Sequence, residues 1–201
     1  QNAVFLARHG HGHTIPPHMI NYRANIWALN YIGVKSVIAV AAVGGIRKDL
    51  PPKTLVAPDQ IIDYTWSRSH TFFEDRLTSV VHIDFTEPYS AELRQALIDG
   101  GKKANIALVE EGTYGAMQGP RLESAAEINR MERDGCDMVG MTGMPEAVLA
   151  RELQLRYATC GVVANWAAGR GGQITMSELN QNLSQSMQRV RTLLESVIRA
   201  L

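Results

Sequence analysis

The chain has 201 residues, of which 45% are hydrophobic and 20% charged, the composition of a folded single domain spanning residues 1–201. Its 20 basic and 20 acidic residues give a formal net charge of zero, which argues against a protein that binds nucleic acid or an anionic membrane through a basic excess. No apolar run approaches the ~20 residues of a membrane span. Two separated cysteines, Cys136 and Cys160, favour the reducing cytoplasm over a disulfide framework.

Strand-like and helix-like segments alternate along the chain. A short apolar strand is predicted over 3–7, followed by a turn rich in glycine and histidine. Apolar residues at helical spacing predict a helix over 19–32, and a near-continuous apolar run predicts a buried strand over 36–43. The remaining predicted strands are 54–57, 107–117, 137–141 and 157–163, and the remaining predicted helices are 90–103, 124–134, 145–153 and 176–201. This alternation is typical of an α/β fold with a mixed, mostly parallel sheet flanked by helices.

Arg8 and His9 follow the first predicted strand. Ligands gather at the carboxyl ends of strands in α/β sheets, and a guanidinium matches the geometry of phosphate oxygens. The alternative interpretations are ordinary turn residues and a metal site made by His9, His11 and His13. No nearby acidic residue or cysteine completes such a ligand set, and Arg8 would repel a cation. The pattern therefore favours an anion site over a metal site.

Residues 137–147 join a predicted strand to a predicted helix. The apolar strand ends at Thr142, after which Pro145 suits the first helical position because its missing N–H needs no partner there. Glu146 complements the positive end of the helix dipole. Thr142 is therefore predicted to contact an anion or a sugar hydroxyl. The glycines in 42–45 similarly allow backbone amides to approach an anion.

Glu123 and Asn165 also lie at predicted strand or helix ends. Glu123 precedes the helix predicted over 124–134, so it is either a helix-cap carboxylate or a ligand-binding group. Asn165 follows the strand predicted over 157–163, so it is either a turn residue or a ligand-binding group. The local patterns leave both interpretations open.

Four ordered blocks resemble the purine nucleoside phosphorylase/methylthioadenosine phosphorylase family. The blocks are Leu6–Gly10, Asn21–Leu29, Gly119–Arg121 and Gly140–Glu146. The resemblance implies phosphorolysis of a purine nucleoside to the free base and a pentose 1-phosphate, with phosphate as co-substrate, no metal or organic cofactor, and a homotrimeric assembly. It also implies an N-terminal strand and a glycine-rich phosphate loop. No such loop precedes Phe5, so the sequence is expected to be N-terminally incomplete.

Carried onto matching positions, the resemblance implies where phosphate and sugar bind. The phosphate ligands would be Arg8, His9, Thr142 and the backbone of Ala42. Met141 would lie under the ribose. His82 would reach the 5′ side of the sugar in a neighbouring subunit.

The resemblance also implies how the base is bound. Leu122 would pack on the purine, and Glu123 and Asn165 would contact its polar edge. Asn165 would be the catalytic residue, assisting departure of the base from its N7 side.

The residues at these positions predict which nucleoside is used. Glu123 is an acceptor and suits N1–H of a 6-oxopurine, whereas N1 of adenine is itself an acceptor; Asn165 can donate to O6. Relatives specific for adenine resemble this chain with Asp in place of the asparagine and lack the glutamate.

The start of the last predicted helix bears on the sugar. Family members that use ordinary nucleosides carry a histidine there for the 5′-hydroxyl, but this chain has no histidine beyond His82. Met176 and Leu179 would instead form an apolar wall that favours a methylthio group. The prediction is phosphorolysis of 5′-methylthioinosine. The alternatives are a methylthioadenosine phosphorylase, an inosine/guanosine phosphorylase or a non-catalytic nucleoside-binding domain.

Overall fold

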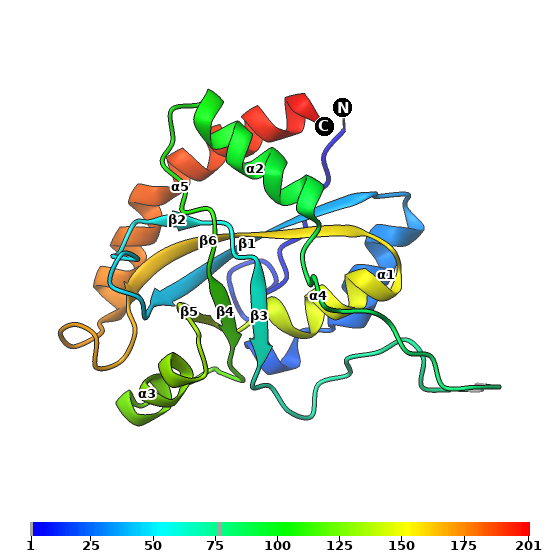
Figure 1. The fold of residues 1–201 in the computed structure, drawn as a ribbon, viewed down its shortest axis with the longest axis horizontal. Coiled ribbons are helices and arrows are strands. Elements are labelled where there is room, and N and C mark those ends of the chain that lie inside the picture. Colours follow the sequence, from blue (N-terminus) through cyan, green and yellow to red (C-terminus); the bar gives the residue numbers. More distant parts are fainter. Residues whose placement is uncertain (1, 76–77) are drawn as a thin grey trace.

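The computed structural model describes residues 2–75 and 78–201, which form one six-stranded sheet with helices on both faces (Figure 1). The order of the strands is β2-β6-β1-β5-β4-β3. Their bounds are β1 Ser36–Gly45, β2 Leu55–Val56, β3 Gln60–Asp63, β4 Thr113–Ala116, β5 Met138–Gly140 and β6 Arg156–Trp166. The sheet is mixed, with parallel β1–β6, β3–β4 and β4–β5 pairs and antiparallel β1–β5 and β2–β6 pairs. The predicted α/β fold is confirmed.

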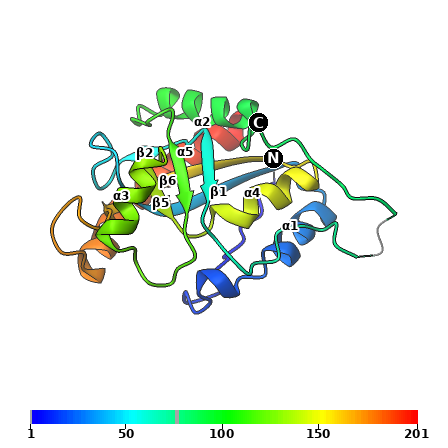
Figure 2. The same cartoon turned by 60° about the horizontal axis from the view of Figure 1, so that its bottom comes forward.

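The helices divide between the two faces of the sheet. The α-helices are α1 Tyr22–Tyr31, α2 Ala91–Lys103, α3 Ala125–Arg133, α4 Gly143–Glu152 and α5 Met176–Ala200, and a short 3-10 helix, η1, spans Pro17–Met19. Figures 1 and 2 show α2 and α5 packed on one face, with α1 and α4 on the opposite face. No helix in the described part of the chain is long and apolar enough to cross a membrane.

Two apolar clusters hold these layers together. Leu55, Leu93 and Leu193 are fully buried between the sheet and the α2–α5 pair. On the other face, Ile26 and Leu149 join the cluster under α1 and α4. Burying a side chain of this size contributes roughly 1.5–3 kcal/mol. The sheet is thus held in place by apolar packing on both of its faces.

The long strands β1 and β6 form the centre of the sheet. They pair in parallel along their whole length, with an irregularity between Val43 and Gly44. On its other side, β1 pairs with β5 only at Gly44 and Gly45. Among the described residues, no strand is paired with that side of β1 over residues 36–43.

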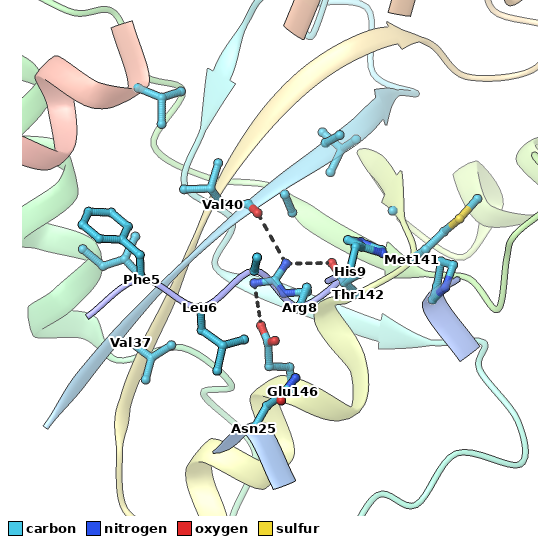
Figure 3. Close-up of a pocket in the computed structure, with 18 of the residues that line it drawn as sticks. Phe5, Leu6, Arg8, His9, Asn25, Val37, Val40, Met141, Thr142 and Glu146 are labelled. Atoms are coloured by element: carbon cyan, nitrogen blue, oxygen red, sulfur yellow. Dashed lines mark hydrogen bonds and ion pairs between the residues drawn. The ribbon is translucent and has the colours of Figure 1, made fainter. Parts of the chain in front are cut away.

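The strand predicted over 3–7 is not present. These residues cross the open side of β1, with Phe5 and Leu6 near Val37, but they form no β-ladder with the described strands (Figure 3). An extended segment becomes a strand only when its N–H and C=O groups pair with a neighbour. The apolar side chains of this segment are among those that line the cavity beside β1.

Other boundaries differ from the sequence-based expectation. The strand predicted over 107–117 is confined to β4, and β3 was not predicted. The strand predicted over 157–163 is longer, because β6 continues to Trp166, so Asn165 lies inside a strand rather than in a turn. The register of the sheet therefore fixes the backbone of Asn165.

Candidate active site

A single open cavity of about 1680 Å³ brings most of the predicted site residues together. It lies beside β1, the ends of β5 and β6, and one side of α5. The predicted residues that line it are Arg8, His9, Ala42, Leu122, Glu123, Met141, Thr142, Asn165, Met176 and Leu179. Segments that are far apart along the chain thus meet in the wall of one cavity.

Arg8 lies at the centre of the polar part of the cavity wall (Figure 3). Its Nη1 donates to the Val40 carbonyl at 3.4 Å and to Thr142 Oγ1 at 3.2 Å. Its Nη2 lies 3.0 Å from Glu146 Oε2, in an ion pair whose side chains are only 14% and 5% exposed. These contacts come from β1 and α4, so the guanidinium is held between two elements of the core.

The Arg8–Glu146 pair is completed by a tyrosine. Tyr157 is buried in β6, and its hydroxyl donates to Glu146 Oε2 at 2.8 Å. Burial by itself lowers the pKa of Arg8, but the Glu146 carboxylate and the neighbouring tyrosines together outweigh this effect and the pKa is raised. Burial, followed by the Glu146 charge, raises the pKa of Tyr157. The site therefore contains a charged arginine, a compensating carboxylate and a neutral phenol.

Thr142 occupies the corner between β5 and α4. Its N–H donates to the hydroxyl of Tyr114 at 3.3 Å, and only 6% of the residue is exposed. Met144 has φ −118° and ψ 140°, so helical geometry begins at Pro145, as the sequence predicted. The Thr142 hydroxyl contacts Arg8, which places a hydroxyl and a guanidinium side by side in the cavity wall.

His9 has a defined tautomer when it is neutral. Its Nδ1 lies 2.9 Å from the Ile15 carbonyl, which can only accept, so Nδ1 carries the proton and Nε2 is an acceptor. Burial lowers the pKa of His9, and the nearby charges of His13 and Arg8 act in the same direction. The His9 and His13 rings stack at 4.4 Å. Across residues 2–75 and 78–201, no three His, Cys, Asp or Glu side chains are grouped to hold a metal ion.

The segment before α3 carries Leu122 and Glu123. Ser124 and Glu127 form a capping box, and Arg121 forks onto the Glu127 carboxylate at 2.7 and 2.8 Å. These bonds lower the pKa of Glu127 to about 2 and fix the entry to the helix. Glu123 is half-buried in the cavity wall, and burial raises its pKa.

Asn165 and the start of α5 complete the wall. Asn165 Nδ2 donates to the Trp166 carbonyl at 2.7 Å, which uses one of its two N–H groups. The Thr175 hydroxyl accepts from the Glu178 N–H and fixes the first turn of α5. Met176, 63% exposed, therefore stands at the mouth of the cavity.

His82 is the predicted site residue that does not line this cavity. It is exposed and lies in the extended segment between β3 and α2, which projects away from the sheet (Figure 1). Its predicted contact with a neighbouring subunit's sugar stays a prediction.

Glu146 and Tyr157 are site residues that the sequence analysis did not assign. Glu146 was interpreted only as a helix-dipole partner. A usable indication was present, because one acidic residue inside the otherwise apolar run 143–150 needs a buried counter-charge. Tyr157 gave no comparable indication, since it begins an ordinary buried strand.

Comparison with known proteins assigns this arrangement to a family. The family model described as the Phosphorylase superfamily matches residues 1–199. A probable S-methyl-5′-thioinosine phosphorylase of Xylella fastidiosa is 53% identical, over 99% of this chain and 81% of the relative. A 6-oxopurine nucleoside phosphorylase of Pyrococcus furiosus is 46% identical, over 98% of this chain and 77% of the relative.

A solved structure shows the same fold. Methylthioadenosine phosphorylase from Schistosoma mansoni, in complex with adenine, superimposes with a TM-score of 0.92 at 31% identity, covering 96% of this chain and 74% of that chain. The cavity and its arginine–threonine corner thus belong to a fold shared with nucleoside-cleaving enzymes. The chain belongs to the Phosphorylase superfamily and is a pentosyltransferase of the purine nucleoside phosphorylase type.

Proposed function

We propose that the substrate is a 6-oxopurine 5′-methylthionucleoside, 5′-methylthioinosine, cleaved by phosphate to hypoxanthine and 5-methylthioribose 1-phosphate. The observation that carries this proposal is the presence of Glu123, Asn165 and Met176 in the wall of one cavity. A carboxylate and an amide suit the polar edge of a 6-oxopurine, and a methionine suits a methylthio group. The name of the Xylella relative agrees with a methylthio sugar, and the name of the Pyrococcus relative agrees with a 6-oxopurine base.

Phosphate binds at the Arg8–Thr142 corner in this proposal. Three of the five N–H groups of Arg8 are used by Val40, Thr142 and Glu146, so the others can donate to phosphate oxygens. Neutral His9 offers Nε2 as an acceptor for the hydroxyl of hydrogen phosphate. Together these groups orient a phosphate oxygen toward C1′ of the sugar.

Departure of the base is assisted at the other end of the cavity. As the bond from C1′ to N9 breaks, its electron pair moves onto the purine and positive charge develops on the sugar, as in glycoside hydrolysis. Glu123 accepts a hydrogen bond from N1–H, while Asn165 contacts the N7 and O6 side. Hydrogen phosphate then forms the new bond to C1′, and its proton passes to N7 of the purine, so that the base leaves as neutral hypoxanthine. No metal or organic cofactor takes part.

The active assembly is proposed to be a cytoplasmic homotrimer. The extended segment that carries His82 projects away from the sheet (Figure 1), and His82 does not line the cavity of its own chain, which suits a contact with the sugar site of a neighbouring subunit. Measuring the mass in solution, with and without His82→Ala, tests the assembly and the contribution of the histidine separately.

Substrate choice is tested by comparing 5′-methylthioinosine, methylthioadenosine and inosine in one phosphate-dependent assay. The wild type is expected to favour methylthioinosine. Glu123→Ala is expected to lose about 100-fold in kcat/KM on 6-oxopurines, because an unpaired buried donor costs a few kcal/mol. Glu127→Gln is the matched control, since Glu127 bonds Arg121 and Ser124 instead of lining the cavity.

The second candidate is methylthioadenosine phosphorolysis, which the named activity of the Schistosoma enzyme favours. Faster cleavage of methylthioadenosine than of methylthioinosine by the wild type would establish it. Unchanged rates in Glu123→Ala would likewise contradict a 6-oxopurine substrate.

A further inference from the structure

Arg68 is a buried cation that does not line the cavity. Only 7% of the residue is exposed. Its guanidinium makes six hydrogen bonds, to the carbonyl oxygens of Met117, Gln118, Met141 and Met144, to the side-chain oxygen of Gln118 and to the hydroxyl of Tyr22. The shortest are 2.6 Å to Met144, 2.7 Å to Gln118 and 2.8 Å to Met141.

The carbonyls bound by Arg68 belong to two segments of the proposed active site. Met141 and Met144 flank the turn that holds Thr142, on the phosphate and ribose side. Met117 and Gln118 follow β4 directly and lead to Leu122 and the base side. One planar guanidinium therefore spans the two segments that must be held at a set distance for phosphate and purine to face the same sugar.

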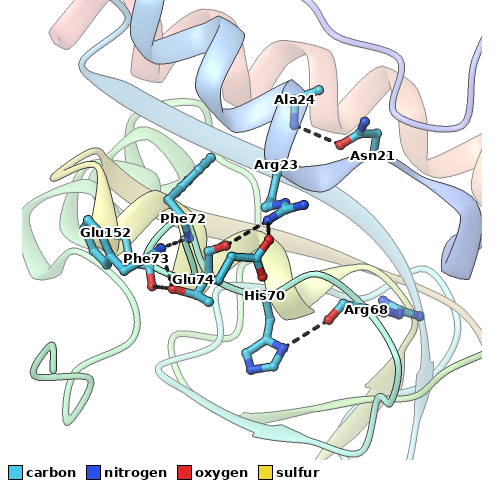
Figure 4. Close-up of polar contacts among 10 residues, drawn as sticks. Asn21, Arg23, Ala24, Arg68, His70, Phe72, Phe73, Glu74 and Glu152 are labelled. Carbon is cyan, nitrogen blue, oxygen red and sulfur yellow. Dashed lines mark hydrogen bonds and ion pairs between the residues drawn. The ribbon is translucent and has the colours of Figure 1, made fainter. Parts of the chain in front are cut away.

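The segment that carries Arg68 is itself tied to the helices. Figure 4 shows Glu152 of α4 accepting hydrogen bonds from the Thr71 hydroxyl and the Phe72 N–H, at 2.6 and 2.7 Å. Arg23 of α1 pairs with Glu74. The segment that follows Arg68 is thus anchored to α1 and α4, and the guanidinium can act as a brace between β4 and the β5–α4 corner.

Burying a charge without a carboxylate contact costs more free energy than filling the same space with an apolar side chain. Among the described residues, no ion pair to Arg68 is found within 4 Å, and its charge is balanced by carbonyl dipoles and by the Tyr22 ring 5.5 Å away. A well-packed apolar residue is often as good or better for stability than a buried charge. What a guanidinium supplies is several donors in one rigid plane, which sets the relative position of its partners.

We propose that Arg68 is a positioning residue for phosphorolysis. It fixes the Met141–Met144 turn relative to the Met117–Gln118 segment, and thereby fixes the distance between phosphate and base across the sugar. This inference rests on the proposed function. A displacement of about 1 Å between reacting groups costs on the order of 100-fold in rate, so loss of the brace should lower kcat.

The test compares three variants of the protein as it is expressed from its own gene. Arg68→Met removes every donor, Arg68→Lys keeps the charge and fewer donors, and Arg94→Met is the matched control. Arg94 also donates to backbone carbonyls, those of Ala57, Pro58 and Glu110, but lies on α2 away from the cavity. The measurements are kcat, KM for each substrate, the melting temperature, and amide hydrogen exchange over residues 117–119 and 141–145.

Arg68→Met is expected to lose about 100-fold in kcat, with KM for both substrates within about threefold of wild type, because the defect is in alignment and not in binding. Its amide exchange should rise in the two braced segments only. Arg68→Lys should recover part of kcat, and Arg94→Met should keep wild-type kcat even where its melting temperature falls.

Equal losses of kcat in Arg68→Met and Arg94→Met, in proportion to the unfolded fraction, would overturn the proposal. So would wild-type kcat in a folded Arg68→Lys together with unchanged exchange in both segments. If Arg68→Met does not fold, Arg68→Lys decides by the same two readouts. Failure of the proposed function is distinguishable, because wild type would then be inactive on the nucleosides while the exchange measurement still tests the brace.

Discussion

The two ends of the cavity are built differently. At the end proposed to bind phosphate, Thr142 and Glu146 are buried and the Arg8–Glu146 ion pair is almost enclosed. At the base and sugar end, Leu122 is 40% exposed and Met176 is 63% exposed. The first end is joined to β1, β6 and α4 by its own hydrogen bonds, whereas the second is formed by residues whose side chains border solvent.

We infer from this difference that the buried end of the cavity serves catalysis and the exposed end serves the choice of substrate. Groups that act on phosphate must be aligned before it arrives, because alignment supplies much of the rate. Groups that select the nucleoside need only discriminate between ligands, and that difference is set by a few side chains. We therefore expect changes at the phosphate end to damage stability and turnover together, and changes at the other end to alter preference.

The largest effect is expected for Arg8→Met. It should lower kcat/KM for phosphate by about 1000-fold through loss of the preorganised donor, and destabilise the fold by about 3–5 kcal/mol because Glu146 is left buried without its cation. The double variant Arg8→Met/Glu146→Gln should recover stability but not activity. Urea unfolding and steady-state kinetics measure the two effects.

Arg47→Met is the control for that experiment. Arg47 pairs with Asp49 and Asp137 at a more exposed position, so its loss should cost less than about 1 kcal/mol. Recovery of phosphorolysis by the double variant would show that Arg8 supports only the fold, and would break the distinction between the two ends.

An intermediate effect is expected for Met176→His. Exchanging an apolar side chain for a donor at the cavity mouth should shift the ratio of kcat/KM values toward inosine and away from 5′-methylthioinosine by about tenfold, the range that one pocket contact supplies. Ser177→His, on the neighbouring position outside the cavity, should leave the ratio unchanged. A large loss on both nucleosides would mean that the mouth contributes to chemistry as well as to preference.

The smallest effect concerns pH. Burial raises the pKa of Glu123, so activity on a 6-oxopurine should begin to fall at a higher pH than for an ordinary glutamate, whose pKa is 4.5. When the pKa of a carboxyl is higher in the folded state than in the unfolded state, the protein loses stability as the pH rises from the unfolded-state pKa through the folded-state pKa. Glu123→Gln should therefore raise the melting temperature at neutral pH, and the advantage should vanish as pH falls below 4.5. A pH–rate profile and thermal melts with Glu127→Gln as control check both expectations.

Sequence periodicity predicted the elements that bury a continuous face. The near-continuous apolar run of 36–43 and the amphipathic pattern of 176–201 correspond to β1 and α5. The wrong secondary-structure predictions concern segments whose structure depends on pairing with a neighbouring strand. Residues 3–7 are apolar but lie unpaired beside β1, and β3 has no alternating burial that would identify it.

The site could be located from strand ends but not fully specified. Arg8, His9 and Thr142 follow or end predicted strands, and the structure places them in one cavity wall. The Arg8–Glu146 ion pair joins residues that only the tertiary fold brings together. Arg68 lies in a loop without periodicity, where residue type alone does not distinguish a solvated arginine from a buried one.

The compensation of Arg8 by Glu146 also affects how phosphate reaches the site. A cavity whose central cation is already neutralised, in a chain of zero net charge, projects little field into solvent. Phosphate is then retained by short-range hydrogen bonds and not drawn in from a distance. Because only long-range attraction is screened at ionic strengths near 0.15 M, where the Debye length is about 8 Å, capture of phosphate should be nearly as fast in high salt as in low salt.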